Sequence, residues 1–166
     1  MIIAIDVHYR ETYAKAVAIE FEDWQVENPT KINQVLLPEI APYIPGQFYK
    51  RELPCIVEVL EQSNLSLVET IIIDGYVTLD DTKKPGLGRY LYEYLEKSIP
   101  VIGVAKTSFK DNKKFVREVF RGESKQPLFV TCVGMKLEEA AKRILEMSGE
   151  FRIPTLLKIL DTETKR

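Results

Sequence analysis

Residues 68–75, which read VETIIIDG, decide the fold of this chain. The stretch is rich in β-branched residues and lacks polar alternation, which is typical of a central strand buried on both faces. It ends in an acid, Asp74, followed by Gly75. Residues 2–6, IIAID, are a second apolar run that ends in an acid, Asp6. Because functional groups collect beyond the carboxyl ends of strands in open α/β sheets, the two acids mark a candidate site.

The remaining hydrophobic pattern predicts how the other elements follow along the chain. Extended segments are expected at 13–21, more loosely at 24–26 and 34–37, at 100–105, and in a charged hairpin of 115–120 and 128–132. Helices are expected at 47–62, 86–97 and 136–147, and in a last segment that Pro154 opens. Strand pairs followed by alternating helices and strands predict an α/β fold. We expect a mixed sheet, antiparallel at one side and parallel at its centre, with helices on both faces.

Length and composition set limits on the kind of protein. With 166 residues, 45% hydrophobic and 29% charged, the chain is long enough for one core, so we expect one domain over 1–166 and a monomer. No secretory signal or membrane-spanning stretch is visible, which favours a cytoplasmic protein. Cys55 and Cys132 lie in apolar surroundings without metal-ligand spacing, so reduced thiols are favoured over a zinc site or a disulfide.

The charge pattern gives a local rather than a global signal. The formal net charge of -2 argues against a purely electrostatic nucleic-acid binder. Residues 106–125, however, hold seven basic side chains against three acidic ones. This stretch is either a phosphate-facing patch or a solvated hairpin of mixed charge.

Three acids are candidates for metal chemistry. If the strands ending at Asp6 and Asp74 lie side by side, their carboxylates meet, and they repel each other unless a cation or a proton lies between them. Glu52 is a third candidate, on the helix that follows the proline-rich segment 42–46. Each acid alone could instead be a turn former or an exposed helical acid. Because no cluster of imidazole or thiolate groups is present, Mg²⁺ or Mn²⁺ would be favoured over zinc.

Six segments in order resemble the endonuclease V family, and together they cover nearly the whole chain. They are IDVHY (5–9), PYIPG (42–46), RELP (51–54), IDG (73–75), IGVAK (102–106) and RIP (152–154). The resemblance implies a ribonuclease H-like fold and a metal-dependent endonuclease that hydrolyses phosphodiester bonds.

The resemblance also implies roles for individual residues. Asp6, Glu52 and Asp74 match the family's catalytic and metal-binding acids. Asp161 falls where a further metal ligand is placed, although a helix-capping or solvated role is the alternative. Lys106 matches a lysine that stabilises phosphate charge as a point cation.

A second set of residues is implied in nucleic-acid binding. In the family, the proline-rich segment is a rigid wedge that enters the duplex at the lesion, and its tyrosine stacks where a base has been unstacked. The residues so implied are Tyr9, Pro42, Tyr43, Ile44, Pro45, Gly46, Gly75 and Lys106. The implied partner is DNA or RNA containing hypoxanthine, cut one nucleotide to the 3′ side of that base.

The chain departs from the family pattern in the loop after Gly75. Residues 76–84 contain no histidine and carry two additional acids. The only histidine, His8, either assists proton transfer or is a bystander. Two alternatives therefore stay open. One is a nucleic-acid-binding protein of this family with altered or lost turnover, and the other is a different ribonuclease H-like nuclease that recognises branched structures.

Overall fold

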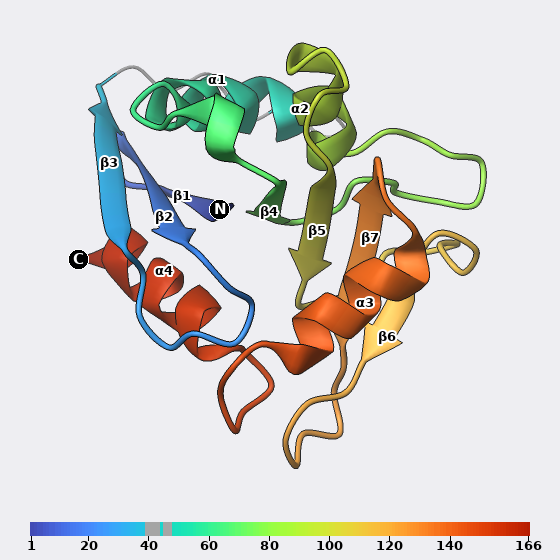
Figure 1. Ribbon diagram of the computed structural model, residues 1–166. Helices are drawn as coiled ribbons and strands as arrows, with labels where there is room; N and C mark the ends of the chain where they lie inside the picture. The colour runs from blue at the N-terminus through green and yellow to red at the C-terminus, as the bar shows by residue number, and fades with distance from the viewer. Residues whose placement is uncertain (39–43, 45–47) are drawn as a thin grey trace.

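The computed structural model describes residues 1–38, 44 and 48–166, which form a seven-stranded sheet and four α-helices (Figure 1). The strands are β1 (Ile2–Tyr9), β2 (Ala14–Phe21), β3 (Lys31–Leu37), β4 (Thr70–Asp74), β5 (Val101–Ala105), β6 (Arg117–Val119) and β7 (Leu128–Val133). The helices are α1 (Phe48–Leu60), α2 (Leu87–Tyr94), α3 (Leu137–Glu146) and α4 (Thr155–Lys165), with a short 3₁₀ turn, η1 (Leu65–Leu67).

The sheet is parallel in the middle and antiparallel at both sides. Its strand order is β3-β2-β1-β4-β5-β7-β6. β4 lies between β1 and β5 and runs parallel to both. The pairs β1-β2, β2-β3, β5-β7 and β6-β7 are antiparallel. The carboxyl ends of β1, β4 and β5 therefore reach the same edge of the sheet.

Helices cover both faces, α1 and α2 on one and α3 and α4 on the other (Figure 1). Successive strand residues face opposite sides, so Ile73 packs with the first helix pair and Ile72 with the second. The predicted α/β fold with a mixed sheet and helices on both faces is confirmed. Two cores of buried aliphatic side chains fix how the helices sit over the strand ends.

The structure corrects several of the expected boundaries. β1 continues past Asp6 to Tyr9, because β2 pairs with it over its whole length. Residues 24–26 form no strand, and β3 begins at Lys31 instead. The antiparallel region predicted at one side occurs at both, since β7 pairs with β5 and β6 with β7.

The structure also corrects the expectation for Arg121, which was counted among the basic residues of the stretch 106–125. Its side chain is buried, and its guanidinium donates to the carbonyl oxygens of Met147, Gly149, Phe151 and Arg152. It therefore fixes the loop that leads into α4 and is not available to a phosphate.

Two smaller expectations concern the thiols and the membrane. Cys55 and Cys132 are free; Cys55 is buried and Cys132 half-buried. Among the described residues, no helix combines the length and the apolar character that crossing a bilayer requires.

Candidate active site

Strand register brings Asp6 and Asp74 together. In the parallel pair of β1 and β4, Ile5 lies opposite Ile73, so the two aspartates are the next residues on adjacent strands. Residues in register on parallel strands point to the same face, here the face covered by α4. The Asp6 carboxylate accepts a hydrogen bond from the Val7 N–H at 2.8 Å, which fixes its orientation.

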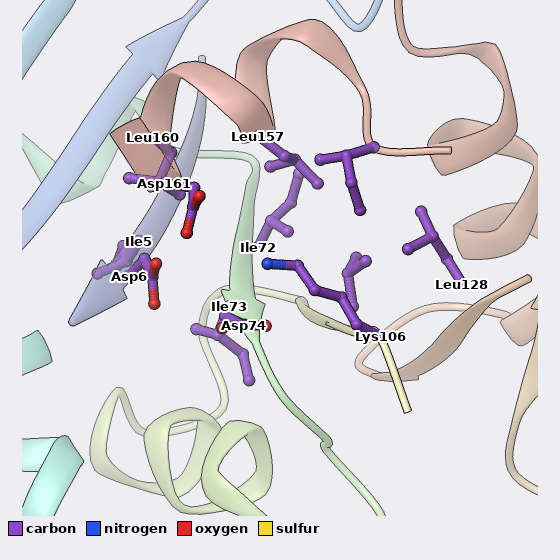
Figure 2. Close-up of a pocket in the computed structure, with 12 residues that line it drawn as sticks. Ile5, Asp6, Ile72, Ile73, Asp74, Lys106, Leu128, Leu157, Leu160 and Asp161 are labelled. Carbon is purple, nitrogen blue, oxygen red and sulfur yellow. The ribbon is translucent and has the colours of Figure 1, made fainter. Parts of the chain in front are cut away.

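Lys106 and Asp161 complete the group on this face. Lys106 follows the end of β5, and Asp161 lies on α4. Together with Asp6 and Asp74 they line a cavity of about 40 Å³ whose other walls are aliphatic. Figure 2 shows the three carboxylates and the Lys106 amine pointing into a common space. The structure thus places four of the five predicted catalytic residues around one cavity.

Glu52, the fifth, reaches the same edge from the opposite face of the sheet. It lies in the first turns of α1 and is only 5% exposed. Its charge interacts with those of Asp6 and Asp74, so the three acids are electrostatic neighbours. Oε2 of Glu52 is buried and has no hydrogen-bond partner among the described residues. A buried carboxylate oxygen without a partner destabilises the folded chain unless something binds it.

The pKa values reflect this crowding. Burial, and then repulsion by Asp6 and Asp74, raise the pKa of Glu52 to about 9. Burial, and then the charge of Asp74, raise the pKa of Asp6 to about 7, although the Val7 N–H works against this. At neutral pH and without a cation, Glu52 therefore holds a proton and Asp6 is close to half ionised.

The other two acids have different environments. Asp74 is partly open to solvent, yet the surrounding protein atoms desolvate it and raise its pKa, which the Lys106 charge partly offsets. Burial tends to raise the pKa of Asp161, but the hydrogen bond from Lys165 and the charge of Lys106 outweigh it and lower the pKa. The Lys165 ammonium lies 3.0 Å from Asp161 Oδ1. Asp161 is therefore an ionised acid that already has a cationic partner.

The predicted metal site is not preformed. Among residues 1–38, 44 and 48–166, no group of three or more His, Cys, Asp or Glu side chains is arranged to hold a metal ion. Asp6, Glu52, Asp74 and Asp161 offer only oxygen donors at this edge of the sheet. The metal therefore stays a prediction.

A larger cavity of about 550 Å³ adjoins the acids. Asp74 and Lys106 line both cavities. The larger one is walled mainly by residues that follow β4 and β5 and by the start of α2, and its aromatic lining residues are Tyr49, Tyr76 and Phe109. The Tyr76 and Phe109 rings meet edge to face at 5.9 Å. A flat ring with polar edges fits a cavity of this size and lining.

The residues predicted to contact nucleic acid lie in different environments. Gly75 lines the larger cavity with φ of +128°, a backbone conformation that favours glycine. The ring of Tyr9 is covered on one face by the Arg51 guanidinium at 3.7 Å, so no base can stack on that face. Ile44 is exposed. The other wedge residues, Pro42, Tyr43, Pro45 and Gly46, lie outside the described residues.

Sequence reasoning did not single out the residues that support the site. The Arg152 guanidinium donates to the carbonyl oxygens of Lys106 and Pro127, so it fixes the end of β5. Its place in the RIP segment was the available signal. Phe109 also carried a sequence signal, because it is an aromatic residue within a lysine-rich stretch. Its position in the cavity wall, however, depends on tertiary contacts.

The chain matches the endonuclease V family over residues 1–162. It belongs to this family. Asp6, Glu52, Asp74, Lys106 and Asp161 all lie within the matched residues.

Two relatives show how the chain compares with longer proteins. A bifunctional methyltransferase/endonuclease of Picrophilus torridus is 28% identical over 98% of the chain and 53% of its own length. An endonuclease V of Dehalococcoides mccartyi is 32% identical over 70% of the chain and 59% of its own length. The chain thus spans little more than half the length of these relatives.

Solved endonuclease V structures share the fold. The enzyme of Ciona intestinalis, crystallised with a DNA containing an inosine followed by a ribo-adenosine, superposes with a TM-score of 0.79 and 18% identity. The match covers 99% of the present chain and 84% of the Ciona chain. The predicted ribonuclease H-like architecture of an endonuclease V is confirmed at this level.

Proposed function

We propose that this chain is a metal-dependent endonuclease that hydrolyses a phosphodiester bond near a deaminated base, with hypoxanthine as the expected lesion. The observation that carries the proposal is the convergence of Asp6, Glu52 and Asp74 at one edge of the sheet. The three acids come from separate elements and would repel each other if all were ionised, an arrangement that a structural role alone does not require.

The side chains suit a hard divalent cation. Their donors are all carboxylate oxygens, which favour Mg²⁺ or Mn²⁺. Oε2 of Glu52, which has no hydrogen-bond partner among residues 1–38, 44 and 48–166, would supply a buried lone pair for such an ion. Asp6, Glu52 and Asp74 would hold it, with Asp161 as a further ligand if Lys165 releases it. When bound, divalent cations in such sites lower the pKa of the attacking water and stabilise the leaving oxygen.

The remaining chemistry falls to the chain's own residues. The Lys106 ammonium points into the space between the acids, where it would neutralise charge on the reacting phosphate. Arg152 would hold that lysine in place through the carbonyl oxygen of Lys106. The partly open carboxylate of Asp74 lies where both cavities meet, so it borders both the phosphate position and the base position.

The larger cavity would take the base. A base that leaves the stack needs an aromatic or apolar surface to lie on, and Phe109, which is 41% exposed, offers one. The inosine-containing DNA in the Ciona complex supports hypoxanthine as the base to test first. DNA and RNA are both candidate strands.

The test is cleavage of end-labelled oligonucleotides that contain one inosine, as DNA and as RNA, with Mg²⁺, Mn²⁺ or EDTA. We expect one nick beside the inosine, only with metal, and none in strands without inosine. We also expect that Asp74→Asn folds and binds but does not cut. Binding without cleavage would leave the nucleic-acid-binding alternative, and nicking that follows branch geometry instead of inosine would leave the structure-specific nuclease. Unchanged turnover in Asp74→Asn would remove that acid from the mechanism.

A further inference from the structure

The loops that follow β4 and β5 are joined into one surface. Oδ1 of Asp81 accepts hydrogen bonds from the backbone N–H groups of Lys113 and Lys114, both at 2.8 Å. The side-chain amide of Asn112 donates to the carbonyl oxygen of Thr78 at 2.8 Å. The loops project side by side at the right of Figure 1. We call residues 78–85 and 107–116 the two-loop platform.

Exposed lysines gather on this platform. It carries five exposed lysines, Lys83, Lys84, Lys110, Lys113 and Lys114. Within the part of the chain that the structure describes, none of these five forms an ion pair.

Four lysines elsewhere in the chain lie beside acids. Lys97, Lys142, Lys158 and Lys165 each lie within ion-pair distance of an acid. The platform holds five lysines against three acids, Asp80, Asp81 and Asp111, so it has a local excess of positive charge in a chain whose net charge is -2.

Two of the three acids of the platform, Asp80 and Asp81, accept hydrogen bonds within it. Oδ1 of Asp80 accepts from the hydroxyl and the N–H of Thr82 and from the N–H of Lys84. The Thr82 hydroxyl, and then the Lys84 N–H, lower the pKa of Asp80. The N–H groups of Lys114 and Lys113 lower the pKa of Asp81 in the same way. Asp80 and Asp81 thus stabilise the platform through backbone N–H groups, and among the described residues neither carboxylate forms an ion pair with a platform lysine.

The platform is continuous with the candidate active site. Lys84 and Phe109, one from each loop, line the larger cavity together with Asp74 and Lys106. A strand whose base entered that cavity would have its neighbouring phosphates beside the platform lysines. Phosphodiester groups are the polyanions for which such point cations are suited.

We propose that the two-loop platform binds the phosphate backbone of the strand whose base occupies the larger cavity. The inference rests on the proposed function and deepens it, because it assigns the sequence-independent part of substrate binding to the platform lysines. Neutralising phosphates releases counterions, so this part of the binding must weaken as salt rises.

The test is the salt dependence of binding for Lys113→Gln/Lys114→Gln. The substitutions remove two charges but keep the backbone N–H groups that bond Asp81. Binding of labelled single strands, as DNA and as RNA, is followed by fluorescence anisotropy in EDTA, which prevents metal-dependent cleavage. The slope of log Kd against log salt, between about 50 and 200 mM KCl, should become shallower by about 1.4. The matched control Lys136→Gln/Lys142→Gln, with the same change of charge on and beside α3, should keep the wild-type slope.

Each outcome has a defined meaning. A wild-type slope in folded Lys113→Gln/Lys114→Gln would overturn the platform, and so would an equal loss of slope in the control. Lys83→Gln/Lys110→Gln repeats the test if the first variant unfolds.

With metal present, the platform variant should show a raised KM and an unchanged kcat. A shallower slope in a chain that cuts no substrate would support the platform and contradict the proposed nuclease, so the two can fail separately. A difference between the DNA and RNA arms would show which backbone the lysines prefer.

Discussion

At the scale of single residues, Glu52 has the environment least compatible with a charge. Its carboxylate is buried, one oxygen has no partner among the described residues, and its pKa is raised to about 9. The folded chain therefore retains a proton that the unfolded chain releases above the ordinary value of 4.5. Because the native state binds more protons in this range, the free energy of unfolding should fall as pH rises from 4.5 to about 9.

Glu52→Gln tests this linkage. The amide has no proton to lose, so the variant should be more stable than the wild type near pH 9 by about 1–3 kcal/mol, and the difference should shrink towards pH 4.5. Urea unfolding in EDTA measures it, and the same variant should lose cleavage. Equal stability of both proteins near pH 9 would show that Glu52 is not held in a charge-excluding environment.

Lys106 is a cationic side chain that acts directly on the acids of the site. Its charge lowers the pKa of both Asp6 and Asp74. Lys106→Met should reduce kcat about 10²–10³-fold, the usual cost of losing one preorganised group that stabilises transition-state charge. Single-turnover cleavage at saturating enzyme measures the chemical step, with Lys136→Met as a matched control. An unchanged rate would mean that Lys106 contributes only to binding.

At the scale of elements, β5 supports the turn that follows β4. A side chain at Gly103 would meet the carbonyl oxygen of Gly75 at 2.5 Å and Oγ1 of Thr131 at 2.8 Å. That hydroxyl oxygen accepts the N–H of Val77 and so fixes the turn beside Asp74.

Gly103→Ala should therefore push this turn outward. Overpacking predicts a loss of about 1–3 kcal/mol of stability. The rate of cleavage should fall more in Gly103→Ala than in the control Ile102→Val, which changes a residue on the same strand. Thermal unfolding and kcat at a temperature where both variants are folded give the comparison. Wild-type activity in Gly103→Ala would show that the turn does not position Asp74.

The loop into α4 depends on Arg121. Arg121→Met leaves the carbonyl oxygens of Met147, Gly149 and Phe151 without this donor, so stability should fall by about 3 kcal/mol. In the half-buried Arg143, whose ion pair with Glu139 is 4.0 Å long, the change Arg143→Met should cost about 0.5 kcal/mol or less. Urea unfolding measures both, and amide exchange should rise at 147–153 in the first variant only. Matching losses would mean that the loop is held by other contacts.

At the scale of the whole molecule, the parallel centre of the sheet was predictable because its signals are local. The stretches that became β4 and β5 are apolar runs, and both are buried on two faces. Their order with the intervening helix left little choice of topology. The meeting of Asp6 and Asp74 followed from that order, since strands buried side by side carry their next residues to the same edge.

The rest depends on contacts that no local pattern contains. The continuation of β1 to Tyr9 comes from pairing with β2, and the burial of Arg121 comes from a distant loop. The ion pair of Asp161 with Lys165 is a helix-surface contact that competes with a metal role. The aromatic walls of the larger cavity come from three separate segments, so their proximity could not be predicted from spacing.

The central claim is that acids from β1, α1 and β4 gather to hold a divalent cation. Anomalous scattering from a crystal soaked in Mn²⁺ tests it most directly. We predict a manganese peak enclosed by the carboxylates of Asp6, Glu52 and Asp74, with Lys106 beside it but not coordinating. Manganese peaks at other sites of the protein, with no peak between these three acids, would contradict the account.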